Sequence, residues 1–433
     1  MTCNYPKMGA GMNLKIFVAT IVGTMLEYFD FLLFLHFSMI ISPLFFPTSD
    51  PIAAAIMSLG VLAVGFIARP IGGLIFGTIG DQRGRKRTLS LAVFGIGLPT
   101  LCIGLMPTYA QIGVLAPVAL LLCRVFQGFS LGGEYTIAGI FLMEHINGQK
   151  RGFYSSLLCA SGTVGSLIAL GCSYLVLRPG MPDWAWRVPF LLGAVAAIFG
   201  YKLRQVLKES PEFIKIMKGI GINPEPSAKA QWQEILSNYK AFLITIGIGS
   251  LVGVLVWTPM TYTNFYLTKI AGWPLIEAMP MTLISVVGYI VFLPLMGMVG
   301  DAIGHRKLMF WSASVTMVAA YPLFLCLTNN IVVPFQIAFA FLAASFGSTI
   351  HAMMIDLYPP AQRCRAISLG FSIGIGTLGG ASPFIAAALV NITGSPLAPA
   401  IYIMLVALFG VWAMSVYHAY DEKTAANIHL KAA

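Results

Sequence analysis

The sequence predicts an all-α membrane protein with twelve transmembrane helices in two pseudo-symmetric six-helix bundles. Three observations predict this fold: a very apolar composition, twelve stretches long enough to cross a bilayer, and an internal repeat that relates the two halves. Of the 433 residues, 58% are hydrophobic and only 10% are charged. A soluble protein of this size needs a far more charged exterior, so the chain is expected to turn apolar side chains outward to lipid.

The apolar stretches define the predicted spans, because about 20 helical residues cross the hydrocarbon core. The first is too long for a signal-peptide core and contains Glu27 and Asp30, which indicates a retained helix. One long polar stretch separates the sixth span from the seventh. It divides the chain into an N-terminal bundle (1–206), a cytoplasmic linker loop (207–239) and a C-terminal bundle (240–433). The predicted spans are 15–42, 52–79, 88–106, 112–142, 153–177, 188–206, 241–269, 280–299, 308–327, 331–355, 366–391 and 397–419.

The basic residues orient the chain. Of the 26 Lys and Arg residues, 21 fall in the tails and alternate loops on one side, three fall on the other side, and Arg69 and Arg124 lie inside apolar stretches. This asymmetry follows the positive-inside rule, so the net charge of +10 indicates a membrane orientation and no nucleic-acid partner. The prediction is a multi-pass protein of the cytoplasmic (inner) membrane, surrounded by the lipid bilayer, with both termini cytoplasmic.

An internal repeat supports the division into halves. The segment 77–87, with Asp81 near its centre, recurs 220 positions later as 297–307, with Asp301 at the same place. Each copy joins the second and third helices of its half, and such repeats are typical of transporters. A second repeated motif lies between helices four and five of each half, where an acid precedes an arginine by seven residues. The pairs are Glu144 and Arg151 in the first half and Asp356 and Arg363 in the second.

Three acidic residues lie deep inside the predicted spans. From the cytoplasmic edge, Glu27 is about 18 Å deep, Asp30 about 22 Å and Glu134 about 15 Å, at about 1.5 Å per residue. A charge in hydrocarbon is unfavourable, so each is a functional candidate, and a carboxyl group that exchanges a proton is what proton coupling requires. The alternative is that these acids pair with Arg69 or Arg124 and only hold helices together. The sequence does not tell which acid carries the proton.

Arg69 and Arg124 are candidate substrate-binding residues. Both are permanently charged, and a guanidinium binds a carboxylate through two parallel hydrogen bonds. They therefore suggest a substrate with a carboxylate, either a di- or tricarboxylate or a zwitterion such as proline or betaine. Neutralisation of the three deep acids is the alternative. In the C-terminal half, four residues either line a binding cavity or belong to an interfacial belt or packed core: Trp257, Tyr262, Asn264 and Tyr266.

Several motifs together resemble one family. They are the Gly-x3-Asp-x2-Gly-Arg-Lys loop at 77–86, Glu27-Tyr-Phe-Asp30 in helix 1, Arg69-Pro-Ile-Gly-Gly in helix 2, Arg124-Val-Phe-Gln-Gly in helix 4 and Glu209-Ser-Pro-Glu-Phe213 after helix 6. With twelve spans and a central polar loop, the chain resembles the major facilitator superfamily. Its branch looks like the metabolite:proton symporters for proline/betaine, alpha-ketoglutarate and citrate. The second loop departs from the pattern, with His305 where an arginine is usual.

The resemblance implies that the cytoplasmic loops act as gates. Asp81 is expected to pair across neighbouring helices with Arg85 and Lys86 when the inner side is closed. A solvated turn would not explain why an acid stands at this place in both halves. The other predicted gating residues are Asp301, Arg306, Glu144, Arg151, Asp356 and Arg363.

The predicted function is import of a small carboxylate-bearing metabolite by proton symport with alternating access. The alternatives are an antiporter or an uncoupled facilitator of the same fold, and, less favoured, a membrane enzyme or a non-transporting sensor. An enzyme is not expected, because the short loops carry no catalytic constellation. Apart from the coupling proton we expect no cofactor and, from the cysteine spacing, no metal. The protein is expected to act as a monomer.

Overall fold

The computed structural model describes residues 14–46, 51–146, 148, 150–176, 178–219 and 228–432, and these residues form helices and connecting turns without a strand. Part of the predicted linker loop, residues 220–227, lies outside them. The N-terminal half contains six long helices, α1 (Leu14–Phe45), α2 (Pro51–Arg83), α3 (Arg85–Leu105), α5 (Leu115–His145), α6 (Arg151–Val176) and α7 (Arg187–Gln205), and the one-turn α4 (Tyr109–Ile112).

The C-terminal half has the same order of helices, but several are interrupted. The π-helical segments η1, η2 and η4 break the first and fifth long helices, and α14 and α15 are separated by a turn; such interruptions often mark functional sites. The linker contributes α8 (Pro211–Gly219) and α9 (Ala228–Ser237), where the sequence had predicted only a polar loop. The C-terminal elements are α10 (Tyr239–Trp257), η1 (Thr258–Tyr262), α11 (Thr263–Phe265), η2 (Tyr266–Ile270), α12 (Leu275–Ile303), α13 (His305–Thr328), α14 (Val332–Gly347), α15 (Ile350–Met354), η3 (Ile355–Leu357), α16 (Arg363–Ile373), η4 (Gly374–Gly379), α17 (Ser382–Thr393) and α18 (Ala398–Ala432).

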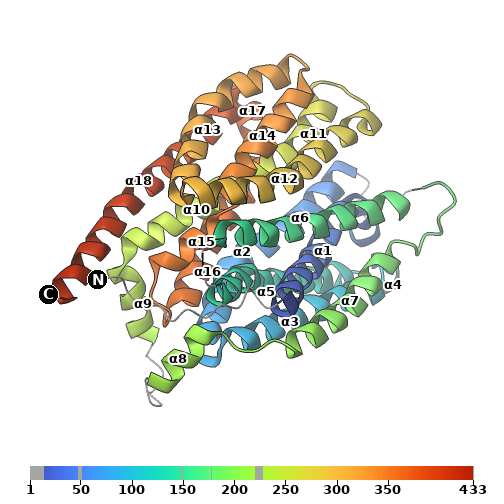
Figure 1. Cartoon of the computed structure of the whole chain (residues 1–433). Coiled ribbons are helices and arrows are strands. Elements are labelled where there is room, and N and C mark those ends of the chain that lie inside the picture. Colours follow the sequence, from blue (N-terminus) through green and yellow to red (C-terminus); the bar gives the residue numbers. More distant parts are fainter. Residues whose placement is uncertain are drawn as a thin grey trace.

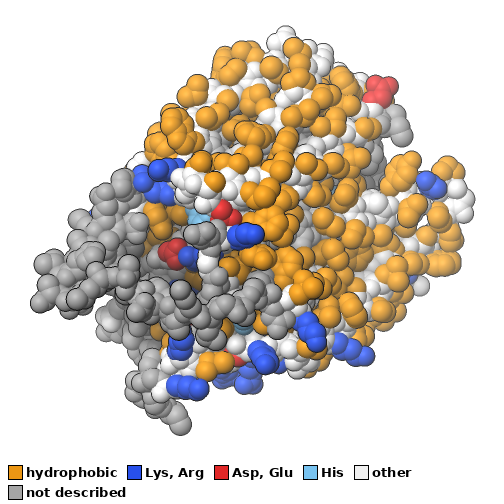
Figure 2. Space-filling view, in the orientation of Figure 1, with side chains coloured by type: hydrophobic (Ala, Val, Ile, Leu, Met, Phe, Trp, Pro, Cys, Tyr) orange, Lys and Arg blue, Asp and Glu red, His pale blue; other side chains and the backbone are white. Residues whose placement is uncertain are grey.

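The outer surface is that of a membrane protein. Ten helical stretches among the described residues are long and apolar enough to cross a bilayer, and α2 and α7 lie at the places of the second and sixth predicted spans. Hydrophobic side chains cover most of the coloured part of the visible face, and most of its Lys and Arg side chains lie toward the lower edge and the left, with one at the right edge (Figure 2). The linker helices α8 and α9 lie at the left end as well, which is the end predicted to be cytoplasmic (Figure 1).

The two halves meet along two pairs of helices related by the repeat: α2 packs against α16, and α6 packs against α12 (Figure 1). The first glycine of the repeated loop permits both approaches. A Cβ atom on Gly77 would lie 2.6 Å from the Cα atom of Arg365, and one on Gly297 would lie 2.5 Å from the Ser156 hydroxyl oxygen. Close backbone contact between halves therefore depends on a residue without a side chain at both positions.

Candidate functional site

A small cavity lies between the two halves, at the centre of the molecule. Its volume is about 70 Å³, smaller than the few hundred Å³ typical of a ligand pocket. Tyr28 and Tyr135 from the N-terminal half face Trp257, Tyr289 and Phe371 from the C-terminal half across it. The remaining lining residues are Leu32, Cys159, Gly162, Thr163, Ser166, Val252, Gly253, Val256, Met260, Ile350 and Ile375.

Arg69 lies directly behind this cavity. Its side chain is buried, and its guanidinium carbon stands 5.5 Å from the ring centroid of Phe66 and 5.8 Å from that of Phe31. Its hydrogen-bonding neighbour is Tyr28, and the Phe66 ring contacts the edge of the Trp257 ring. Because Tyr28 and Trp257 both line the cavity, one layer of side chains separates Arg69 from it.

Arg124 is the second buried guanidinium of the N-terminal half. It lies over the rings of Phe31 and Phe34, at 4.3 and 4.6 Å from their centroids. Its Nη1 donates to the backbone oxygen of Phe31 (3.2 Å) and to Gln127 Oε1 (2.8 Å). Within the described ranges, no carboxylate forms an ion pair with Arg69 or Arg124. A buried charge without a counter-ion is unfavourable, so both arginines are suited to a ligand that supplies one.

The deep acids pair with a different arginine. Arg204 lies 2.6 Å from Glu27 Oε1 through Nη1 and 2.6 Å from Glu134 Oε1 through Nη2, and all three side chains are almost fully buried. Thr24 donates a further hydrogen bond to Glu134 Oε1 (3.2 Å). We call Glu27, Glu134 and Arg204 the Arg204 triad. It joins α1, α5 and α7 inside the N-terminal half and does not line the central cavity.

Sequence reasoning missed Arg204. Arg204 was among the 21 basic residues assigned to the tails and loops on one side, and its burial was not predicted: it stands in the last turn of α7, and its side chain is 1% exposed. The expectation that Arg69 or Arg124 neutralises Glu27 and Glu134 finds no support in the ion pairs of the described residues. Gly23, four residues before Glu27, leaves room for this side chain, since a Cβ atom there would lie 2.9 Å from the Arg204 guanidinium.

Asp30 stands apart from the triad. It is 2% exposed, it takes part in no ion pair of the described chain, and its Oδ1 has no hydrogen-bond partner there. It faces Gly193 of α7, where a Cβ atom would lie 2.1 Å from that oxygen. An unpaired buried carboxyl group is far more stable neutral than ionised, which makes Asp30 a candidate proton carrier.

The predicted aromatic residues of the C-terminal half separate into two groups. Trp257 lines the cavity, whereas Tyr262, Asn264 and Tyr266 are not among its lining residues. Tyr262 is fully buried and stacks on Phe324, with ring centroids 6.1 Å apart. The structure therefore places Tyr262 and Tyr266 in packed core, whereas Asn264 is half-buried and lies outside the cavity lining. Three tyrosines that were not predicted as site residues line the cavity instead: Tyr28, Tyr135 and Tyr289.

At the end predicted to be cytoplasmic, the two loop acids bind across the halves in the same way. Asp81 accepts hydrogen bonds from the backbone N–H groups of Cys364 (2.9 Å) and Arg365 (3.0 Å), at the start of α16. Asp301 accepts them from Gly152 (2.7 Å) and Phe153 (2.9 Å), at the start of α6. A carboxylate at a helix N-terminus satisfies free N–H groups and complements the helix dipole. Both contacts join the two halves at this end.

The second repeated motif of the sequence forms crossed ion pairs. Glu144 pairs with Arg363 at 2.8 Å, and Asp356 pairs with Arg151 at 3.1 Å, so each acid binds the arginine of the other half and not the one that follows it in sequence. Arg85 adds to the first pair, with Nε 3.2 Å from Glu144 Oε2, and also donates to the backbone oxygen of Pro360. Both pairs therefore join the N-terminal half to the C-terminal half.

The expected pairing of Asp81 with Arg85 and Lys86 is wrong in its partners, because its carboxylate accepts from backbone N–H groups. The Lys86 ammonium donates to the backbone oxygen of Gln205 (2.8 Å), within the N-terminal half. Arg306 donates to the backbone oxygen of Met414 (3.1 Å), within the C-terminal half. The side chains of Lys86 and Arg306 thus bind inside their own halves.

The described residues contain two repeated halves of six long helices each, some of them interrupted, a cavity between the halves and cross-half contacts at one end. These features define a secondary transporter of the major facilitator fold. The profile described as "Sugar (and other) transporter" matches residues 15–430. The chain belongs to this family of the major facilitator superfamily, whose members are transporters and not enzymes, as the sequence predicted.

Individual relatives agree with this assignment. The chain is 31% identical to the proline/betaine transporter of Escherichia coli K12 over 409 residues, 92% of this chain and 82% of the relative. It is 31% identical to the alpha-ketoglutarate permease of the same strain over 381 residues, 86% of each chain. Among solved structures it resembles the proton:xylose symporter XylE of E. coli, with a TM-score of 0.73, 17% identity and coverage of 93% of this chain and 94% of the other, which supports the fold.

Proposed function

We propose that the protein imports a small carboxylate-bearing metabolite together with a proton, by alternating access. The observation that carries the proposal is Arg69, a buried guanidinium that no carboxylate of the described residues pairs with, one side-chain layer behind a cavity that both halves line. A substrate carboxylate that reaches Arg69 would supply the missing counter-charge through two hydrogen bonds. The relatives named for proline/betaine and alpha-ketoglutarate support this class of substrate.

A charge count gives a reason for coupling substrate to proton. The deep charges of the N-terminal half are three acids (Glu27, Asp30 and Glu134) and three arginines (Arg69, Arg124 and Arg204), so they balance when all are ionised. A proton on one acid leaves one positive charge in excess, and a substrate carboxylate removes this excess. Since net charge inside a membrane protein is unfavourable, proton and substrate would each favour binding of the other.

The cavity wall favours a compact substrate with an apolar or cationic part. Five aromatic side chains line it, namely Tyr28, Tyr135, Trp257, Tyr289 and Phe371. Aromatic faces attract a quaternary ammonium, so the wall suits a zwitterion, whereas the two unpaired arginines also suit a dicarboxylate. We keep both substrate classes in the proposal.

For the transport cycle, we propose that the crossed contacts of Asp81, Asp301, Glu144 and Asp356 are the inner gate. They hold the cytoplasmic side closed, and the small cavity would enlarge as the halves rock about α2–α16 and α6–α12.

Uptake into proteoliposomes tests the proposal. Labelled proline, betaine and alpha-ketoglutarate are each offered with and without an inward proton gradient. We expect at least one to accumulate above equilibrium with the gradient, and only to equilibrate without it. Equal uptake in both conditions would favour an uncoupled facilitator, and stimulation by an outward gradient would favour an antiporter.

A further inference from the structure

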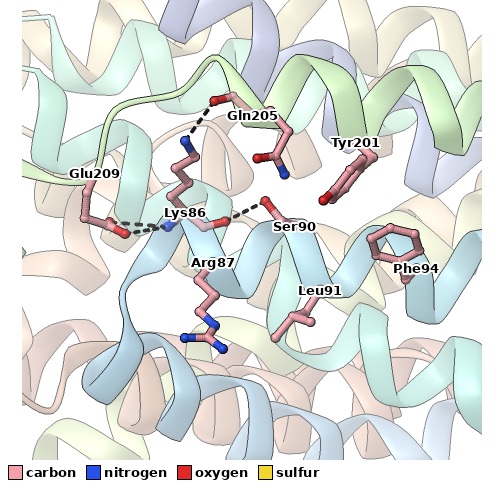
Figure 3. Close-up of a pocket in the computed structure, with 8 residues that line it drawn as sticks. All are labelled: Lys86, Arg87, Ser90, Leu91, Phe94, Tyr201, Gln205 and Glu209. Atoms are coloured by element: carbon pink, nitrogen blue, oxygen red, sulfur yellow. Dashed lines mark hydrogen bonds between the residues drawn. The ribbon is translucent and has the colours of Figure 1, made fainter.

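A groove on the cytoplasmic edge of the N-terminal half has no part in the proposed transport path. It has a volume of about 320 Å³ and lies between the start of α3 and the end of α7. We call it the α3–α7 groove. Figure 3 shows its lining: Lys86, Arg87, Ser90, Leu91, Phe94, Tyr201, Gln205 and Glu209.

One end of the groove is basic. Lys86 and Arg87 occupy the first turn of α3, at the predicted cytoplasmic edge, and their side chains extend to opposite sides of the helix (Figure 3). Lys86 is tethered to the Gln205 backbone oxygen, whereas Arg87 is exposed and pairs with no acid in the part of the chain that the structure describes.

The acid in this groove is already occupied. Glu209 accepts hydrogen bonds from the backbone N–H groups of Arg85 (3.0 Å) and Ser210 (2.9 Å) through Oε1, and of Lys86 (3.1 Å) through Oε2. Its charge is directed at the start of α3 and not at the lysine and arginine side chains. The groove therefore presents an excess of positive charge at its cytoplasmic end.

The other end of the groove is apolar and faces the membrane. Phe94 lies seven residues beyond Arg87, about 10 Å deeper along the helix, and is 53% exposed. Its ring packs against Tyr201 of α7 with centroids 4.6 Å apart, and Leu91, between the two ends, is 43% exposed. The polar Ser90 and the Tyr201 hydroxyl lie at the middle of the groove and point toward each other (Figure 3).

We propose that the α3–α7 groove binds an anionic phospholipid of the cytoplasmic leaflet. The phosphate would lie against the exposed Arg87 side chain, and an acyl chain would lie along Leu91 and Phe94, which share one face of α3 with Arg87. A basic end at the membrane surface and an apolar end about 10 Å deeper match the two parts of a lipid. A soluble anion would use only the first of these features.

The test uses the full-length protein in detergent, with native mass spectrometry to count bound lipid as phosphatidylglycerol or phosphatidylcholine is titrated. Arg87→Gln removes the free cation of the groove. Lys307→Gln is the matched control, because Lys307 stands 220 positions later in the repeat, is also exposed, and lies outside the groove. We expect Arg87→Gln to lower the affinity for the first bound phosphatidylglycerol about five-fold, whereas Lys307→Gln should leave this affinity unchanged.

Two further measurements locate the lipid. Phe94→Ala should lower the affinity for phosphatidylglycerol but leave any binding of glycerol 3-phosphate unaltered, because only the acyl chain of the lipid would reach Phe94. Equal losses in Arg87→Gln and Lys307→Gln would overturn the proposal in favour of non-specific attraction at the membrane surface. Equal affinity for phosphatidylcholine, or full displacement of lipid by glycerol 3-phosphate, would also overturn it.

Discussion

The two halves carry the same cytoplasmic motif in different surroundings. Glu144 is fully buried and contacts Arg85, Arg363 and the Ser210 hydroxyl, so it stands at the centre of what we call the Glu144 cluster. Its counterpart Asp356 is 48% exposed and pairs with Arg151, which is 27% exposed. Removing one partner of a buried ion pair destabilises a protein by about 3–5 kcal/mol, whereas an exposed pair contributes at most about 1 kcal/mol. The repeat therefore forms two contacts between the halves that should differ in the free-energy cost of breaking them.

The same inequality holds deeper in the membrane. Counting the 220 positions of the repeat from Arg69 leads to Tyr289, which lines the central cavity. The N-terminal half thus carries a charge where the C-terminal half carries a phenol. The π-helical interruptions of the described helices, by contrast, lie in the C-terminal half. Two halves with the same helix order can therefore differ in what they carry, with buried charges in one half and interrupted helices in the other.

The largest expected effect comes from Arg204→Met. This change leaves Glu27 and Glu134 buried without a counter-ion, and breaking a buried ion pair in this way destabilises a protein by about 3–5 kcal/mol. We expect a strongly lowered thermal unfolding temperature in detergent and no uptake. Lys202→Met, at an exposed position two residues earlier on α7, is the control and should change neither the unfolding temperature nor uptake.

The triple variant Arg204→Met, Glu27→Gln, Glu134→Gln separates stability from transport. It removes the charges together, so stability should largely recover while gradient-driven accumulation stays absent. Wild-type accumulation in this triple variant would refute a coupling role for the triad.

The second prediction compares the two crossed pairs. Glu144→Gln should favour opening of the cytoplasmic side, because it removes the buried charge that Arg85 and Arg363 share. Asp356→Asn should change the free energy of opening by at most about 1 kcal/mol, because its ion pair is exposed. Cys159 is a native reporter, since it is buried and lines the central cavity. With the other six cysteines replaced, labelling of Cys159 by a membrane-impermeant maleimide from the cytoplasmic side measures opening.

We expect labelling of Cys159 to rise about ten-fold in Glu144→Gln and less than two-fold in Asp356→Asn, as ~1.4 kcal/mol corresponds to ten-fold. Similar labelling in the two variants would show that burial does not set the strength of these contacts.

The third prediction concerns Arg69 and its counterpart. Arg69→Lys keeps the charge but loses the planar pair of donors, so apparent affinity for a carboxylate substrate should fall about ten-fold. Tyr289→Phe removes one hydroxyl from the same place in the other half and should weaken binding about three-fold or less. Binding is measured on purified protein by calorimetry. A mild effect of Arg69→Lys, combined with a strong effect of Tyr289→Phe, would move the substrate site to the C-terminal half.

Most of the fold could be predicted from the sequence, because it depends on local signals. Runs of about 20 apolar residues place the helices, and the repeated loop at 77–87 relates the halves. The partners of individual charges could not be predicted in this way. Arg204 stands where a cytoplasmic basic residue is expected, and only the packing of α7 against α1 brings it to Glu27.

The partners of the predicted gating residues could not be fully predicted from the sequence either. The sequence identified Asp81, Glu144 and Arg363 but gave Asp81 side-chain partners, although it binds backbone N–H groups. Backbone groups carry no sequence signature, so a contact of this kind becomes visible only when helix ends are placed in space. The roles of these residues in transport stay predictions.

The smallest expected effect separates the two copies of the loop most cleanly. Gly84 and Gly304 have almost the same backbone conformation, with φ of +99° and +100°, where an alanine is strained by about 1–3 kcal/mol. Their surroundings differ. A Cβ atom on Gly84 would lie 2.3 Å from Glu209 Oε2, whereas one on Gly304 would meet open space. Gly84→Ala should therefore destabilise the protein about 1 kcal/mol more than Gly304→Ala, and the difference should vanish when Glu209→Ala is added to both. Thermal unfolding of the four variants in detergent measures this; equal losses in the two single variants would mean that Glu209 moves aside freely and does not fix the start of α3.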